Sequence, residues 1–163
     1  MRNSPEQIGM LAALGSFGLL AGAWFFQSIG YAPCAMCIWQ RYPHAIAIVL
    51  GIFLILGFKN KLVFIVGALA AATTSAIGVF HTGVERDWWE GPTSCTGSGE
   101  NLGGLSGSDL LSTDGVAGLV MCDQVVWSFL GLSMASWNAA LSFLIFGVWL
   151  VALVRARAGI EAV

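Results

Sequence analysis

Four long apolar segments, each almost free of charged residues, constrain this chain more than any other feature. They cover residues 8–29, 38–58, 62–83 and 134–154. A helix needs about 20 apolar residues to cross the hydrocarbon core of a bilayer, and each segment is long enough. Only 10% of the residues are charged, whereas soluble domains have about 25%. The sequence therefore predicts one all-α integral membrane domain over residues 1–163, built as a bundle of four transmembrane helices in the lipid bilayer.

The start of the first segment has a second interpretation. Its Ala21-Gly22-Ala23 has the small residues of a signal-peptide cleavage site. The apolar run continues past this point through Trp24, Phe25 and Phe26, which favours a retained span. Pro43 falls near the start of the expected second helix, where early N–H groups have no partner within the helix.

The charges in the loops predict the orientation of the chain. By the positive-inside rule, the side with more basic residues is cytoplasmic. That side carries the termini and the loop 59–61, and loops 30–37 and 84–133 face an oxidising compartment in which disulfides persist. Sparse leucines between Leu102 and Leu111 indicate a short surface helix in the long loop. The basic residues number five against two: Arg2, Lys59, Lys61, Arg155 and Arg157, against Arg41 and Arg86.

A pair of cysteines stands at the start of the second segment, in Pro33-Cys34-Ala35-Met36-Cys37. A thiolate there would be stabilised by the helix N-terminus and by a nearby cation. Arg41 supplies that cation, since Cys37, Arg41 and His44 are spaced to share one helix face. An arginine in an apolar span is a functional candidate by default, although it could instead reach the lipid headgroups.

Two further positions carry chemistry near the same side of the membrane. His81 lies at the outer end of the third segment, four residues before Glu85, and could donate a hydrogen bond or proton, or simply pack. Cys95 and Cys122 lie in the long loop. If paired, they form either a structural disulfide or an exchangeable one. Zinc is disfavoured because closed all-cysteine sites usually have two short-spaced pairs, so no metal is expected.

Two dithiols on one side of a membrane suggest a relay in which thiolates attack disulfides. A net oxidation needs a final electron acceptor, yet no flavin or haem motif is visible in the sequence. A lipid-soluble quinone would suit a cysteine pair at headgroup level. A net charge of −2 provides no basic patch, so nucleic acid is not expected as a partner.

These motifs together resemble the DsbB family of bacterial inner-membrane disulfide-bond oxidoreductases. The resemblance covers nearly the whole chain and rests on Pro33-Cys34-x-x-Cys37-Ile38-x-x-Arg41, on His81-Thr82 followed by Cys95, and on Cys122. The most specific piece is Trp127-x-Phe129-Leu130-Gly131-Leu132-x-Met134-x-x-Trp137. Gln40 and His44 stand outside the shared motif.

The resemblance implies a concrete activity. Such a protein reoxidises a periplasmic thioredoxin-like dithiol oxidase, DsbA, and passes the electrons to ubiquinone or menaquinone. It implies the redox pairs Cys34–Cys37 and Cys95–Cys122, with Cys95 forming the mixed disulfide, Cys122 resolving it and Cys37 next to the quinone. Arg41 and His81 would line the quinone site. The alternative is a non-catalytic membrane scaffold with two structural disulfides.

Overall fold

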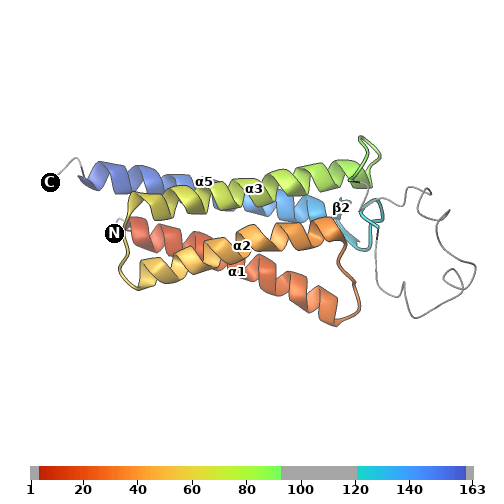
Figure 1. The fold of residues 1–163 in the computed structure, drawn as a ribbon, viewed down its shortest axis with the longest axis horizontal. Helices are drawn as coiled ribbons and strands as arrows, with labels where there is room; N and C mark the ends of the chain where they lie inside the picture. The colour runs from red at the N-terminus through yellow and green to blue at the C-terminus, as the bar shows by residue number, and fades with distance from the viewer. Residues whose placement is uncertain (1–3, 93–120, 161–163) are drawn as a thin grey trace, which may run out of the picture.

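The computed structural model describes residues 4–92 and 121–160. Four long helices run along one another as an all-α bundle (Figure 1). They are α1 (Pro5–Ser28), α2 (Ala35–Ile55), α3 (Lys61–Glu85) and α5 (Met134–Ile160). Each is long and apolar enough to cross a membrane. The expected fold class is therefore confirmed, and the chain is a multi-pass membrane protein.

The ends of the helices follow from local capping. The Ser4 hydroxyl caps α1, and the Gln7 side chain reaches back to the Ser4 main-chain N–H, which forms a capping box. The Asn60 side chain caps α3. Cys34 caps α2 with its sulfur, so α2 begins at Ala35, before the start expected at residue 38.

Pro43 therefore lies well inside α2, and the prediction that it sits in the first turns is wrong. A proline at this depth removes one hydrogen bond from the helix interior. Loop residues 93–120, which include Cys95 and the expected surface helix at Leu102–Leu111, lie outside the described residues.

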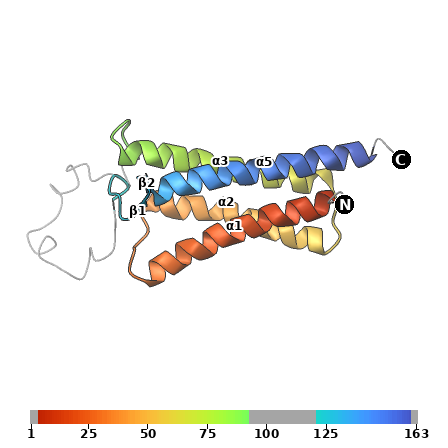
Figure 2. The same cartoon turned by 180° about the vertical axis from the view of Figure 1, so that it is seen from behind.

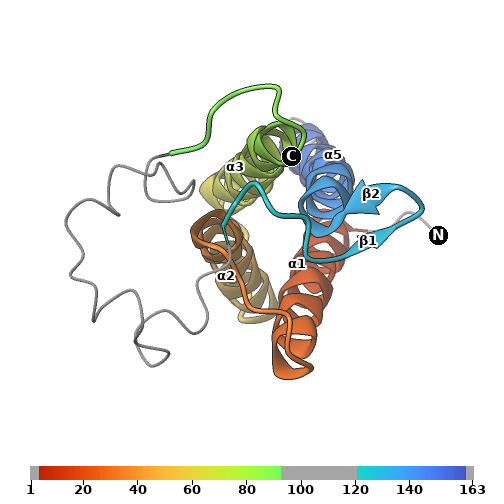
Figure 3. The same cartoon turned by 90° about the vertical axis from the view of Figure 1, so that its right-hand side faces the viewer.

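The helices form a ring in the order α1, α2, α3 and α5 when seen from one end (Figure 3). Both termini lie at one end of the bundle, and the Cys34 end of α2 lies at the other (Figure 2). There, a short hairpin pairs β1 (Ser128–Phe129) with β2 (Leu132–Ser133) just before α5. The sequence analysis expected only loop at this position. Leu130 and Gly131 make the turn with positive φ angles of 53° and 76°, as tight hairpin turns require.

The half of the bundle near the termini is packed closely. Trp149 of α5 is fully buried there and meets Phe64 of α3 edge to face. A Cβ atom added at Gly67 would lie 2.7 Å from the Trp149 indole, and one at Gly51 would overlap the Ala13 side chain. The helices therefore approach one another closely in this half, and the pocket described below lies at the end that carries Cys34.

Candidate active site

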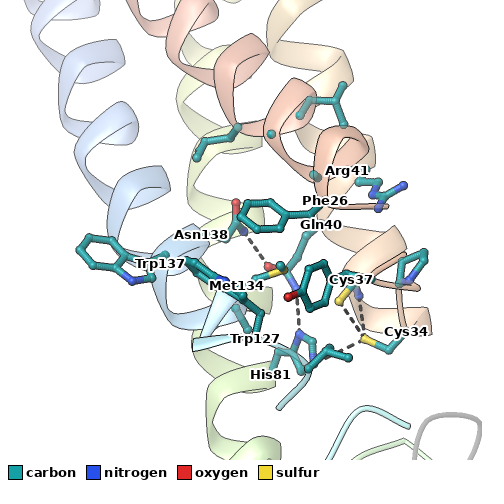
Figure 4. A pocket seen from close by; sticks show the side chains of 18 of the residues that line it. Phe26, Cys34, Cys37, Gln40, Arg41, His81, Trp127, Met134, Trp137 and Asn138 are labelled. Carbon is teal, nitrogen blue, oxygen red and sulfur yellow. Dashed lines mark hydrogen bonds between the residues drawn. The ribbon is translucent and has the colours of Figure 1, made fainter. Parts of the chain in front are cut away.

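A pocket of about 420 Å³ opens at the Cys34 end of the bundle (Figure 4). Its lining comes from α1, α2, α3, α5 and the hairpin segment. One wall is apolar and includes Leu19, Ala23 and Phe26 of α1. The lining also includes the chemical groups predicted from the sequence: Cys34, Cys37, Arg41 and His81.

Cys34 and Cys37 occur as free thiols at the N-terminus of α2. Their Sγ atoms lie 3.0 Å apart, and the Cys37 main-chain N–H donates a hydrogen bond of 3.2 Å to Cys34 Sγ. Cys34 is buried and Cys37 is half-buried against the pocket. The hydrogen bond between the two sulfurs, together with burial, raises the pKa of the Cys34 thiol. Of the pair, Cys34 is therefore the sulfur that retains its proton.

His81 lies next to this pair. Its Nε2 atom is 3.5 Å from Cys34 Sγ, and its Nδ1 atom is 3.1 Å from Gln40 Nε2. The main chain of Cys122 also forms a hydrogen bond with the His81 ring. Glu85 lies one turn further along α3, with Oε1 4.0 Å from Nε2, and its other oxygen accepts a hydrogen bond from Ser133. The histidine thus touches a cysteine of the first pair and the main chain at a cysteine of the long loop.

Cys122 brings the long loop into contact with the first pair. It is disulfide-bonded and fully buried. It packs in one apolar cluster with Cys34, Met36 and Val84. The pairing of Cys122 with Cys95 stays a prediction, because Cys95 is outside the described residues. The fold nevertheless places a disulfide sulfur of the loop close to the cysteine pair at α2.

Arg41 lines the pocket one turn beyond Cys37. Its Nη1 atom donates a 2.7 Å hydrogen bond to Gln27 Oε1 of α1, which holds the guanidinium between the two helices. Its Nε atom is buried, and no acceptor for it is present among the described residues. A buried donor without an acceptor is costly. A carbonyl oxygen of a ligand in the pocket could satisfy it.

The pocket has the groups that a ligand with carbonyl acceptors and an apolar tail would need. A quinone ring carries carbonyl acceptors, and its tail is apolar. The Arg41 donor and the thiols lie at the polar end, and the α1 wall is apolar. Typical ligand pockets combine an apolar lining with few polar groups in this way.

Three side chains of this region were not assigned to the site by the sequence analysis. Gln40, His44 and Asn138 line the pocket and hydrogen-bond to one another: Asn138 Nδ2 lies 2.6 Å from Gln40 Oε1, and Asn138 Oδ1 lies 2.9 Å from His44 Nε2. Gln40 and His44 were left aside because they fall outside the family motif. The available signal was two polar residues four apart in an apolar span, which places both on one helix face.

The described residues include one cluster that could hold a metal ion. Ligand atoms of Cys34, Cys37 and His81 all lie within 4.8 Å of one another. The sequence analysis expected no metal site. The cluster has a second interpretation, because two thiols and a neighbouring proton donor are also what thiol chemistry requires.

Comparison with known proteins agrees with this geometry. The family model described as disulfide bond formation protein DsbB matches residues 5–152. Disulfide bond formation protein B of Albidiferax ferrireducens is 30% identical to the chain, covering 90% of it and 83% of the relative. The protein of the same name from Verminephrobacter eiseniae is 31% identical, and the match covers 92% of this chain and 86% of the relative. Among solved structures, no significant match was found.

Proposed function

Since this chain belongs to the DsbB family of disulfide bond formation proteins, its general role is that of a disulfide-generating thiol oxidoreductase, and we propose the reaction in detail. The protein oxidises the dithiol of a periplasmic thioredoxin-like protein similar to DsbA. It passes the electrons through its two cysteine pairs to ubiquinone or menaquinone in the bilayer.

Each cysteine has one role in this proposal. A thiolate of the partner attacks Cys95 and forms the mixed disulfide, which frees Cys122. The second thiol of the partner then opens this bond, so that the partner leaves oxidised and Cys95 and Cys122 are left as thiols for the next exchange. Cys34 and Cys37 then take up the electrons and restore the Cys95–Cys122 disulfide. The contact of Cys122 with Cys34 in one buried cluster supports this exchange, because transfer between the pairs needs sulfur atoms to approach closely.

The quinone supplies the acceptor for two electrons and two protons. Arg41 binds it by donating hydrogen bonds from its guanidinium, and His81 lines the site beside Cys34. Cys37 presents its sulfur to the pocket from the first turn of α2, where the helix N-terminus favours a thiolate. The apolar α1 wall excludes water and contacts the apolar part of the ligand.

The proposed membrane orientation rests on the distribution of basic residues in the loops. The protein spans the bacterial inner membrane with both termini in the cytoplasm and its cysteines in the periplasm. In support, both termini lie at one end of the bundle and the Cys34 end of α2 at the other.

The observation that carries the proposal is the pocket bordered by Cys37, Arg41 and His81. The test is an assay of quinone reduction by the purified protein with a reduced thioredoxin-like dithiol protein. Turnover should be lost in Cys37→Ser and in Cys95→Ser.

A non-catalytic scaffold makes the opposite prediction. Its disulfides would resist graded redox buffers, and it would bind no quinone. A Cys34–Cys37 pair that opens under mild reductant supports the enzyme.

A further inference from the structure

A chain of hydrogen bonds runs from α5 to Cys34, and two of its side chains, Gln40 and Asn138, have no role in the proposed reaction. It links Asn138, Gln40 and His81 to Cys34, with donor–acceptor distances of 2.6, 3.1 and 3.5 Å. Asn138 and Gln40 are labelled beside His81 and Cys34 in Figure 4. The directions of these bonds can be worked out, because each group has a fixed set of donors and acceptors.

The orientation of the Gln40 amide is settled by its neighbours. Its nitrogen lies 3.2 Å from the main-chain oxygen of Met36, an acceptor only, so this atom must be Nε2. Its oxygen then faces Asn138 Nδ2. The second hydrogen of Gln40 Nε2 points to His81 Nδ1. His81 Nδ1 must therefore accept, and the proton of the neutral ring resides on Nε2.

The Asn138 amide is fixed in the same way. Its Nδ2 atom donates to Gln40 Oε1 and, at 3.1 Å, to Thr74 Oγ1, whose own hydrogen goes to the main-chain oxygen of Gln40. Asn138 Oδ1 accepts from His44 Nε2 at 2.9 Å and from Ser142 Oγ at 3.4 Å. Exchanging the amide oxygen and nitrogen of Asn138 would set two acceptors against each other at the contact with Gln40 Oε1.

The surroundings of His81 Nε2 agree with a proton on that atom. Cys34 Sγ lies 3.5 Å from it and the carboxylate of Glu85 lies 4.0 Å from it. Both groups can accept a hydrogen bond. His81 is buried, so water does not compete for this position.

We propose that Gln40 and Asn138 are positioning residues that hold His81 with its proton on Nε2, so that His81 acts on Cys34 as a hydrogen-bond donor and not as a base. The consequence lies in thiol–disulfide exchange. When a thiolate opens a disulfide that contains Cys34 by attacking the other sulfur, it forms the new S–S bond with that sulfur. The electron pair of the broken bond stays on Cys34 Sγ, where His81 Nε2–H stabilises the new charge without giving up its proton.

This inference deepens the proposed function, but its test needs neither quinone nor partner protein, so the two can fail separately. The chain has only two histidines. Labelling with ¹⁵N-histidine therefore yields two imidazole rings, and a His44→Gln variant assigns them. In the reduced wild type, the His81 ring should show the proton on Nε2. In Gln40→Met, which removes the donor to Nδ1, the ring should show a mixture of tautomers. Asn138→Leu removes only the hydrogen bond to Gln40 Oε1 and should change the tautomer ratio less.

The chemical consequence is measured in a Cys37→Ala background, where Cys34 reacts alone. His81→Ala should slow alkylation of Cys34 at pH 8 by about tenfold, because a hydrogen bond to a charged group is lost from its thiolate. Gln40→Met should slow it less, by about twofold for an equal mixture of tautomers, because part of the His81 rings then keep the proton on Nε2. Ser142→Ala is the matched control. Ser142 donates a hydrogen bond to Asn138 Oδ1 and takes no part in the contact between Asn138 Nδ2 and Gln40, so its loss should leave the alkylation rate unchanged.

Two results would overturn the inference. One is a wild-type His81 ring that carries its proton on Nδ1. The other is a Gln40→Met protein, with wild-type thermal unfolding, that keeps both the Nε2–H tautomer and the wild-type rate of Cys34 alkylation. A purely structural role of Gln40 would alter thermal unfolding and leave the tautomer as it is.

Discussion

Replacing Arg41 by methionine should separate quinone use from thiol exchange. The substitution keeps much of the apolar stem and removes the guanidinium, whose Nε is buried without an acceptor among the described residues and whose Nη1 is held by Gln27. A net contribution of about 1.5–3 kcal/mol is typical of a hydrogen bond to a charged group. At tenfold per 1.4 kcal/mol, the loss corresponds to a rise of about 10- to 150-fold in the KM for quinone.

The assay follows the absorbance of a short-chain ubiquinone while a reduced thioredoxin-like protein is supplied in excess. Arg86→Met is the matched control, because Arg86 follows α3 at the same end of the bundle but does not line the pocket. Its guanidinium lies over the Trp88 ring, 5.4 Å from the ring centroid. Gln27→Leu, which frees the guanidinium, should raise the KM for quinone in the same direction but less.

The KM for the dithiol protein should stay within about twofold in Arg41→Met, because Arg41 contacts α1 and the pocket. If the KM for quinone did not change, or rose equally in Arg86→Met, the assignment of Arg41 to the quinone would be refuted.

Further predictions concern packing and thiol reactivity. Gly67→Ala should be less stable than Gly147→Ala by about 1–3 kcal/mol in detergent unfolding. A Cβ atom at position 67 would lie 2.7 Å from the buried Trp149 indole, whereas one at position 147 would have no atom within 4 Å. Equal stabilities of the two variants would contradict the packing described. The raised pKa of Cys34 keeps its thiol protonated at neutral pH, so substoichiometric alkylation of the reduced protein at pH 7 should label Cys37 first, and peptide mapping that found Cys34 labelled first would refute this. A strong rise in Cys34 labelling should appear only in alkaline buffer.

The four spans and their assembly into a bundle were largely accessible to sequence reasoning, because length and hydropathy determine which helices can cross a bilayer. The start of α2 was misplaced because a cysteine sulfur acts as its cap, and cysteine is not among the usual capping residues. The hairpin was missed because its two-residue strands leave almost no periodic signal.

Only part of the candidate site could be predicted from the sequence. Cys34, Cys37, Arg41 and His81 stood out by residue type and spacing, and the structure places all four on one pocket. Asn138 could not be joined to Gln40 from sequence, since the two are 98 positions apart and only the packing of α5 beside the other helices brings them together. Polar residues inside apolar spans do, however, predict that such partners exist.

The most direct test of the account is quinone reduction in detergent with all four cysteines present, compared with Cys37→Ser and Cys95→Ser. The account predicts turnover with a ubiquinone or menaquinone analogue and a reduced thioredoxin-like protein, and no turnover in either variant. Turnover that persisted in Cys37→Ser would contradict the central role of the cysteine pair at α2. No turnover of the intact protein with either quinone would favour the scaffold.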